Sequence, residues 1–175
     1  HACCHGTHAM IEALLLLCAD GAVAVDDLDE IQVYIAHRWL NVCDIKAPET
    51  GLELKFSYVF LAAMVLRGVN LAAYESYHDG LCHDADLIAL AKRVKIIGDD
   101  QIADGAARVD LKQKGGQLRS QSFDLLSPID PVLLGTRLLA KAKALIGDDR
   151  ANDLWAMTNA LELVSASDLA AKLQG

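Results

Sequence analysis

Aromatic residues are scarce in this sequence, and it has no apolar run long enough to cross a bilayer. Aromatics make up 5% of the 175 residues, so a core has to be built from Ala, Leu, Val and Ile. The apolar stretch at residues 9–19 is interrupted by Glu12 and ended by Asp20 and Gly21, short of the ~20 residues of a membrane span. We therefore expect a soluble globular chain without a membrane partner.

Clustered positive charge is also missing. The net charge is −8 and the 16 Lys and Arg residues are scattered, which makes nucleic acid a poor partner. The five cysteines form an odd set in a chain too large to need a disulfide framework, so we expect reduced thiols. Together with the lack of a signal peptide, this predicts a cytoplasmic protein.

The mean hydropathy of +0.25 is high for a free-standing domain. Surplus apolar surface of this kind predicts packing against another domain or a second copy, so we expect a homo-oligomer. Because the chain begins at His1 without Met, we also expect that an upstream segment is missing.

The order of predicted elements is typical of an α+β fold. Apolar spacing predicts a helix over residues 8–19 with Thr7 as its cap, and residues 31–36 alternate as a half-buried strand would. Residues 52–67 are nearly all apolar and predict one buried helix ended by Gly68.

The remaining elements are shorter, apart from a helical tail. The acidic stretch at residues 26–30 is interpreted as a solvated turn. Gly115-Gly116 supplies the turn of a predicted hairpin, and Pro131 starts the tail. Two short helices, the hairpin and the three helices of the tail are predicted at residues 71–77, 85–94, 106–125, 132–147, 151–164 and 165–174.

Reactive side chains are densest in the first eight residues, which include His1, Cys3, Cys4, His5, Thr7 and His8. A helix N-terminus carries unpaired N–H groups and partial positive charge, and neighbouring His and Thr side chains add further donors for a carboxylate. Imidazoles also act as acid or base near pH 7. We therefore interpret this segment as an anion-binding wall of an active site.

Three other interpretations of the same segment stay open. Thr7 could be only a helix cap, with the cysteines filling the core and the histidines on the surface. A metal site would use the same His and Cys side chains, but no C-x-x-C or H-E-x-x-H pattern is present, so we expect neither metal nor cofactor. A nucleophilic cysteine is a third option, since a helix N-terminus lowers the pKa of a thiol.

The segment CCHGTHAMIEA resembles the entry to the second domain of the MmgE/PrpD family. That family includes 2-methylcitrate dehydratase, cis-aconitate decarboxylase and iminodisuccinate epimerase. The likeness continues in LELKFSYVFLAAMVLRG, which is similar to the family's Lys-Phe-Ser helix, and in a Gly-bearing hairpin and a Pro-Ile step before the last helices. It extends across most of the chain.

The resemblance implies a two-domain enzyme. Residues 1–125 would form its small mixed α/β lid, and residues 126–175 would be helices that pack on a helical domain whose N-terminal part is missing here. It implies no iron–sulfur cluster.

The resemblance also bears on single residues. By the same likeness Cys4 faces substrate, Thr7 and His8 match a Thr-His pair, and Lys55 and Ser57 match the Lys-Phe-Ser motif. We predict His8 and Cys4 as catalytic residues. The predicted substrate-binding residues are Thr7, His5, Lys55 and Ser57. Lys55 fits equally well as a lysine whose stem covers the edge of a buried helix.

These observations favour the C-terminal part of a lyase or isomerase that acts on a small di- or tricarboxylate, for example by proton abstraction and dehydration as in 2-methylcitrate dehydratase. The isolated chain is expected to be inactive without the helical domain. An alternative is a non-catalytic dimeric or regulatory module that retains the lid fold.

Overall fold

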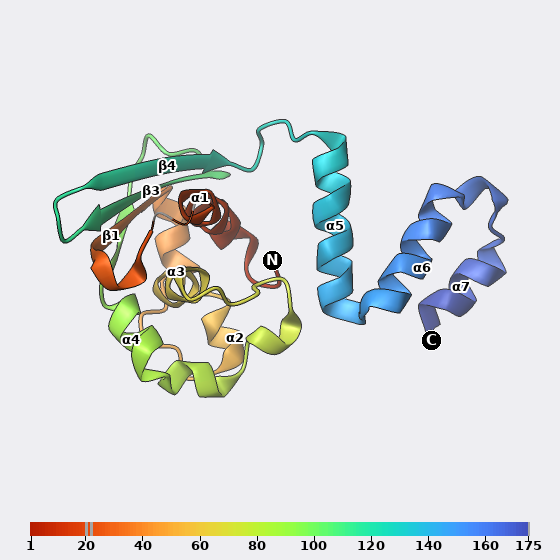
Figure 1. Ribbon diagram of the computed structural model, residues 1–175, viewed down its shortest axis with the longest axis horizontal. Coiled ribbons are helices and arrows are strands. Elements are labelled where there is room, and N and C mark those ends of the chain that lie inside the picture. The colour runs from red at the N-terminus through yellow and green to blue at the C-terminus, as the bar shows by residue number, and fades with distance from the viewer. Residues whose placement is uncertain (20, 22, 175) are drawn as a thin grey trace. The chain divides into compact units, whose positions relative to one another are not determined.

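The computed structural model describes residues 1–19, 21 and 23–174, which form two compact units (Figure 1). The first unit contains residues 1–71 and 75–127, and the second contains residues 72–74 and the chain from Pro128 onward. Asp20, which we expected to end the first helix, lies outside the described residues. No described helix has the length and apolar character needed to cross a membrane.

A four-stranded sheet in the order β2-β1-β3-β4 organises the first unit. β1 runs parallel to β2 and antiparallel to β3, while β3 and β4 form an antiparallel hairpin. The mixed sheet and its helices confirm the α+β prediction. The strands are β1 (Leu28–Ile35), β2 (Val94–Gly98), β3 (Ala106–Gln113) and β4 (Leu118–Asp124).

Alternating side chains give this sheet one apolar face. Ile31 pairs with Leu111 and Val33 with Val109, and all four side chains are buried. The helix α1 contacts β3 and β4, and α3 contacts α1 and β2, so these two helices contribute to the core (Figure 1). The helices of this unit are α1 (His8–Cys18), α2 (Gly51–Leu54), α3 (Tyr58–Leu66) and α4 (Ala85–Ala91).

The expected single helix over residues 52–67 is wrong, because the chain breaks between α2 and α3. Ser57 caps α3 by accepting a hydrogen bond from the Phe60 N–H group. The backbone on either side of the break pairs with a separate segment: the Ile45 N–H donates to the Phe56 carbonyl, and the Tyr58 N–H to the Cys43 carbonyl. These partners replace helical hydrogen bonds that a continuous helix would make.

Three further predictions need correction. Residues 71–77 form no α-helix and contain only a 3₁₀ turn at Tyr74–Ser76. The acidic stretch is only partly a turn, since β1 already begins at Leu28. The helix predicted over residues 85–94 ends at Ala91, and the chain then enters β2. The predicted hairpin is confirmed, with Gly116 at φ +80°.

The second unit has almost no core of its own. Asp130 caps α5 and Pro131 occupies its first turn, as the sequence predicts. Among the described residues from Pro128 onward, Ala151 is the only buried one. Its helices are α5 (Pro131–Ile146), α6 (Asp148–Asn159) and α7 (Ala166–Gln174).

Candidate functional site

The segment before α1 is held in place by backbone hydrogen bonds to residues far along the chain. The Ala2 N–H donates to the Leu71 carbonyl over 2.7 Å. The Cys4 N–H donates to the Lys55 carbonyl over 3.1 Å, at the break between α2 and α3. These contacts fix where the reactive side chains of the segment lie.

Gly6 brings this segment into close contact with its surroundings. The Tyr58 hydroxyl donates to the Gly6 carbonyl over 2.6 Å. A Cβ atom at position 6 would lie 2.4 Å from the indole ring of Trp39, so only glycine fits without displacing that ring. The turn η1 (His5–Thr7) then leads directly into α1.

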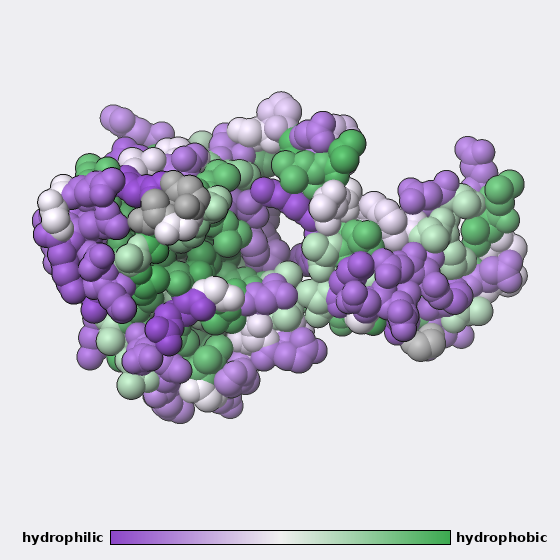
Figure 2. Space-filling view, in the orientation of Figure 1, coloured by the Kyte–Doolittle hydropathy of each residue, from purple (hydrophilic) through white to green (hydrophobic). Residues whose placement is uncertain are grey.

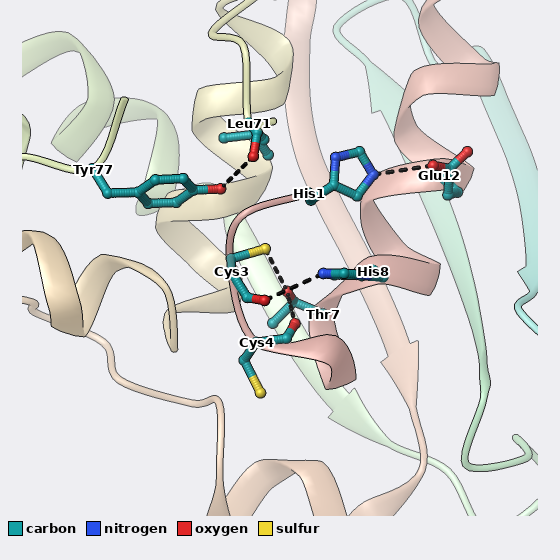
Figure 3. A network of polar contacts seen from close by, with 8 residues as sticks. All are labelled: His1, Cys3, Cys4, Thr7, His8, Glu12, Leu71 and Tyr77. Carbon is teal, nitrogen blue, oxygen red and sulfur yellow. Dashed lines mark hydrogen bonds and ion pairs between the residues drawn. The ribbon is translucent and has the colours of Figure 1, made fainter. Parts of the chain in front are cut away.

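Three imidazole rings, those of His1, His5 and His8, meet at the start of α1. Figure 3 shows two of them, His1 and His8. The ring centroids of His1 and His8 are 5.2 Å apart, and those of His5 and His8 are 5.3 Å apart. Glu12 contacts His1 over 3.0 Å, and the His8 Nε2 atom lies 3.3 Å from the Cys3 carbonyl. His1 therefore belongs to the cluster, as its place among the first eight residues predicts, and its contact with Glu12 joins it to α1.

The thiols around this segment lie in two different environments. The Cys4 Sγ atom is 3.3 Å from the Cys43 Sγ atom, while the Cys3 Sγ atom is 3.3 Å from the Thr7 Oγ1 atom. Burial raises the pKa of Cys3, and side-chain hydrogen bonding with Thr7 and Tyr77 opposes this shift. Burial also raises the pKa of Cys43. Neither Cys3 nor Cys43 is therefore an activated nucleophile.

Thr7 is fully buried, and its hydroxyl donates to the Cys4 carbonyl over 2.7 Å. The prediction that its side chain caps α1 is wrong, because it accepts no hydrogen bond from the helix backbone. The N–H groups of Thr7 and His8 are bonded to the carbonyls of Cys4 and His5. These two N–H groups are therefore not available to an anion, contrary to the expectation of unpaired donors at the start of the helix. Binding of an anion here would depend on side chains.

The two residues of the Lys-Phe-Ser motif differ in what they contact. Ser57 is buried, and its hydroxyl donates to the Ile45 carbonyl over 2.6 Å while capping α3. This places the hydroxyl inside the fold. The Lys55 Nζ atom lies 4.9 Å from the ring centroid of Tyr77, whose hydroxyl donates to the Leu71 carbonyl.

A separate cavity of about 700 Å³ lies between α3, α4 and β2. It is largely apolar, with Phe60, Ile88 and Ile96 in its wall and Lys92 among its polar residues, and no residue of the first eight lines it. Figure 2 shows hydrophobic residues gathered in the middle of the visible face of the first unit. Within the described residues, no three His, Cys, Asp or Glu side chains are placed to hold a metal ion.

The fold and the cluster define a class: a small α+β domain whose entering segment presents imidazoles and a thiol at the start of its first helix. The family model described as the MmgE/PrpD C-terminal domain matches residues 1–151. The chain therefore belongs to the MmgE/PrpD family and represents its C-terminal portion, which confirms the predicted resemblance. No curated protein matches the chain significantly.

Proposed function

We propose that this chain is the C-terminal part of a lyase or isomerase that acts on a small di- or tricarboxylate. The observation that carries the proposal is the meeting of the His1, His5 and His8 rings on a segment fixed by hydrogen bonds to distant residues. Groups that hold carboxylates and groups that move protons are what such reactions require.

His8 is the proposed base. When its Nε2–H group donates to the Cys3 carbonyl, its Nδ1 atom carries the lone pair that accepts a proton. The substrate proton would come from the carbon next to a carboxylate, and the charge that develops there needs nearby donors. His5, which is exposed, and Lys55 are the proposed donors, and Cys4, which is partly exposed, is proposed to face the substrate.

Thr7 and Ser57 have a supporting role in this proposal. Both are buried and both donate their hydroxyl hydrogen to a backbone carbonyl, of Cys4 and Ile45 respectively. They would position the substrate-facing segment without contacting substrate. This revises the assignment of both residues to substrate binding.

The proposed partner is the helical domain that the family implies upstream of this chain. The exposed face of α5 supports it, because Val132 is 77% exposed and Leu133, Leu134 and Leu138 are also exposed. Short helices gain most of their stability from packing, so α5 needs an apolar partner surface. A homo-oligomer and a cytoplasmic location, where the five free cysteines would stay reduced, complete the proposal.

The test is turnover of 2-methylcitrate, cis-aconitate and iminodisuccinate by the chain alone and by the chain co-expressed with an upstream helical domain. We expect turnover only with the partner. In that complex, His8→Gln should lower kcat by about 100-fold, the usual contribution of a general base.

His83→Gln is the matched control for this test, since His83 is exposed and lies outside the cluster. Equal activity of the two variants would contradict the role of His8. A complex that folds but turns over none of the three substrates would favour the alternative, a non-catalytic module with the lid fold. Robust turnover by the chain alone would overturn the assignment to a partial enzyme.

A further inference from the structure

Cys4 and Cys43 lie 39 residues apart in the sequence, yet their sulfur atoms are 3.3 Å apart. Both backbones are anchored to the same break between α2 and α3. The Cys4 N–H donates to the Lys55 carbonyl over 3.1 Å, and the Cys43 carbonyl accepts from the Tyr58 N–H over 3.0 Å. The pairing thus results from backbone hydrogen bonds on both sides and does not depend on side-chain rotamers alone.

Two of the other three cysteines of this unit, Cys3 and Cys82, are placed differently. The Cys3 thiol contacts the Thr7 hydroxyl, and Cys82 is buried in the wall of the separate cavity. A disulfide requires sulfur atoms about 2.05 Å apart, so Cys4 and Cys43 need to approach by little more than 1 Å. Cys4 is partly exposed, so a small oxidant can reach it, whereas Cys43 is fully buried.

We propose that Cys4 and Cys43 form an oxidisable dithiol, a modification site that closes to a disulfide when the protein meets a peroxide. In the first step the Cys4 thiolate attacks hydrogen peroxide, which breaks the O–O bond and gives a sulfenic acid and hydroxide. In the second step the Cys43 thiolate attacks the Cys4 sulfur, the S–O bond breaks and hydroxide leaves. Overall, two thiols and one peroxide give one disulfide and two waters.

The disulfide would join the segment that carries the imidazole cluster to residue 43, beside the break between α2 and α3. It would also remove the Cys4 thiol from the cluster. Burial, which raises the pKa of Cys43, keeps this thiol mostly protonated and slows the second step. Cys43 would therefore close the bond only after Cys4 has been oxidised.

The experiment uses the 175-residue chain, reduced, freed of reductant and treated while folded with a small excess of hydrogen peroxide. After unfolding in guanidinium, we expect loss of two of the five thiols and a mass decrease of about 2 Da. Peptide mapping should link the peptides that contain Cys4 and Cys43. Dithiothreitol should restore both thiols.

Variants separate this pair from the other thiols. Cys4→Ser and Cys43→Ala should abolish the linkage, while Cys3→Ser and Cys82→Ser should still lose two thiols. The map of the unmodified chain gives the answer even where Cys43→Ala fails to fold. An unchanged thiol count, a link between other cysteines, or loss of the link in Cys3→Ser would overturn the proposal. None of these readouts depends on catalysis, so failure of the dithiol proposal can be distinguished from failure of the proposed function.

Discussion

At the scale of single residues, Ser57 joins two parts of the first unit. Its hydroxyl accepts from the Phe60 N–H group at the start of α3 and donates to the Ile45 carbonyl. The side chain is fully buried, so water cannot replace either bond while the protein is folded. Ser57 thus lies at the break in the predicted long helix and also holds the segment that carries Cys43 and Ile45.

Replacing Ser57 by Ala should therefore destabilise the chain. Loss of the cap and of the buried hydrogen bond should lower the free energy of unfolding by about 2 kcal/mol. Urea unfolding followed by circular dichroism measures this. Ser122→Ala, at an exposed position on β4, is the control and should change stability by less than about 0.5 kcal/mol. Equal midpoints for the two variants would show that the Ser57 hydrogen bonds contribute nothing.

Sequence reasoning located the reactive cluster but not the arrangement of its members. Chain proximity was enough to bring His5 and His8 together, because they are separated by one turn. The contact between Cys4 and Cys43 depends on where the break between α2 and α3 falls, and helical periodicity carries no signal for it. The prediction that Thr7 caps α1 failed because a 3₁₀ turn precedes the helix. The carbonyl of His5 in this turn accepts the hydrogen bond of the His8 N–H group at the start of α1.

At the scale of elements, long and strongly patterned segments were predictable, while short ones were not. The hairpin of β3 and β4, the start of α5 and most of β1 follow from alternation, a Gly-Gly turn and Pro131. The 3₁₀ turn at Tyr74–Ser76 was predicted as a helix because apolar spacing over seven residues does not separate the two. Parallel pairing of β1 with β2 also needs information from residues far apart.

The hairpin turn offers a matched pair of glycines. A Cβ atom added at Gly115 or at Gly116 would meet open space, but of the two only Gly116 has a positive φ, of +80°. Gly116→Ala should therefore cost about 1 kcal/mol of stability, while Gly115→Ala should be close to neutral. Thermal unfolding of both variants checks this. A Gly115→Ala variant that is the less stable of the two would contradict the assignment of strain to φ.

At the scale of the whole molecule, buried thiols and phenols make stability depend on pH. Burial raises the folded-state pKa of a set of groups above the ordinary values of 9.0 for cysteine and 10.0 for tyrosine. Above pH 9 the unfolded chain loses these protons and the folded chain keeps them, so the stability falls as pH rises. The groups are Cys3, Cys43, Tyr58, Tyr77 and Cys82.

Below pH 9 we expect these groups to cause no change in the urea concentration at the midpoint of unfolding. Between pH 9 and pH 11 we expect this midpoint to fall. Each group contributes at most about 1.4 kcal/mol per pH unit. A Tyr77→Phe variant, which removes one such phenol, should show a shallower decline over the same range. A midpoint that stays constant up to pH 11 would contradict burial of these groups.

The second unit should be far less protected from hydrogen exchange than the first. Ala151 is its only buried residue among those described, while every residue of α3 is buried. Amides of α5 should show about 100-fold lower protection than those of α3 in the chain alone. Adding the upstream helical domain should slow exchange in α5, as the proposed partnership requires. Slow exchange in the chain alone would mean that α5 is already stabilised by other contacts.

The anchoring of the first residues has a consequence for biosynthesis. Ala2, Cys4 and Gly6 bond to Leu71, Lys55 and Tyr58, which leave the ribosome roughly 3–14 s later at a translation rate of about 5–20 residues per second. During that interval the segment lacks these partners, which hold it in the folded chain. The cluster is thus translated before the residues that anchor it, and chaperones or oxidants can meet it before it is assembled.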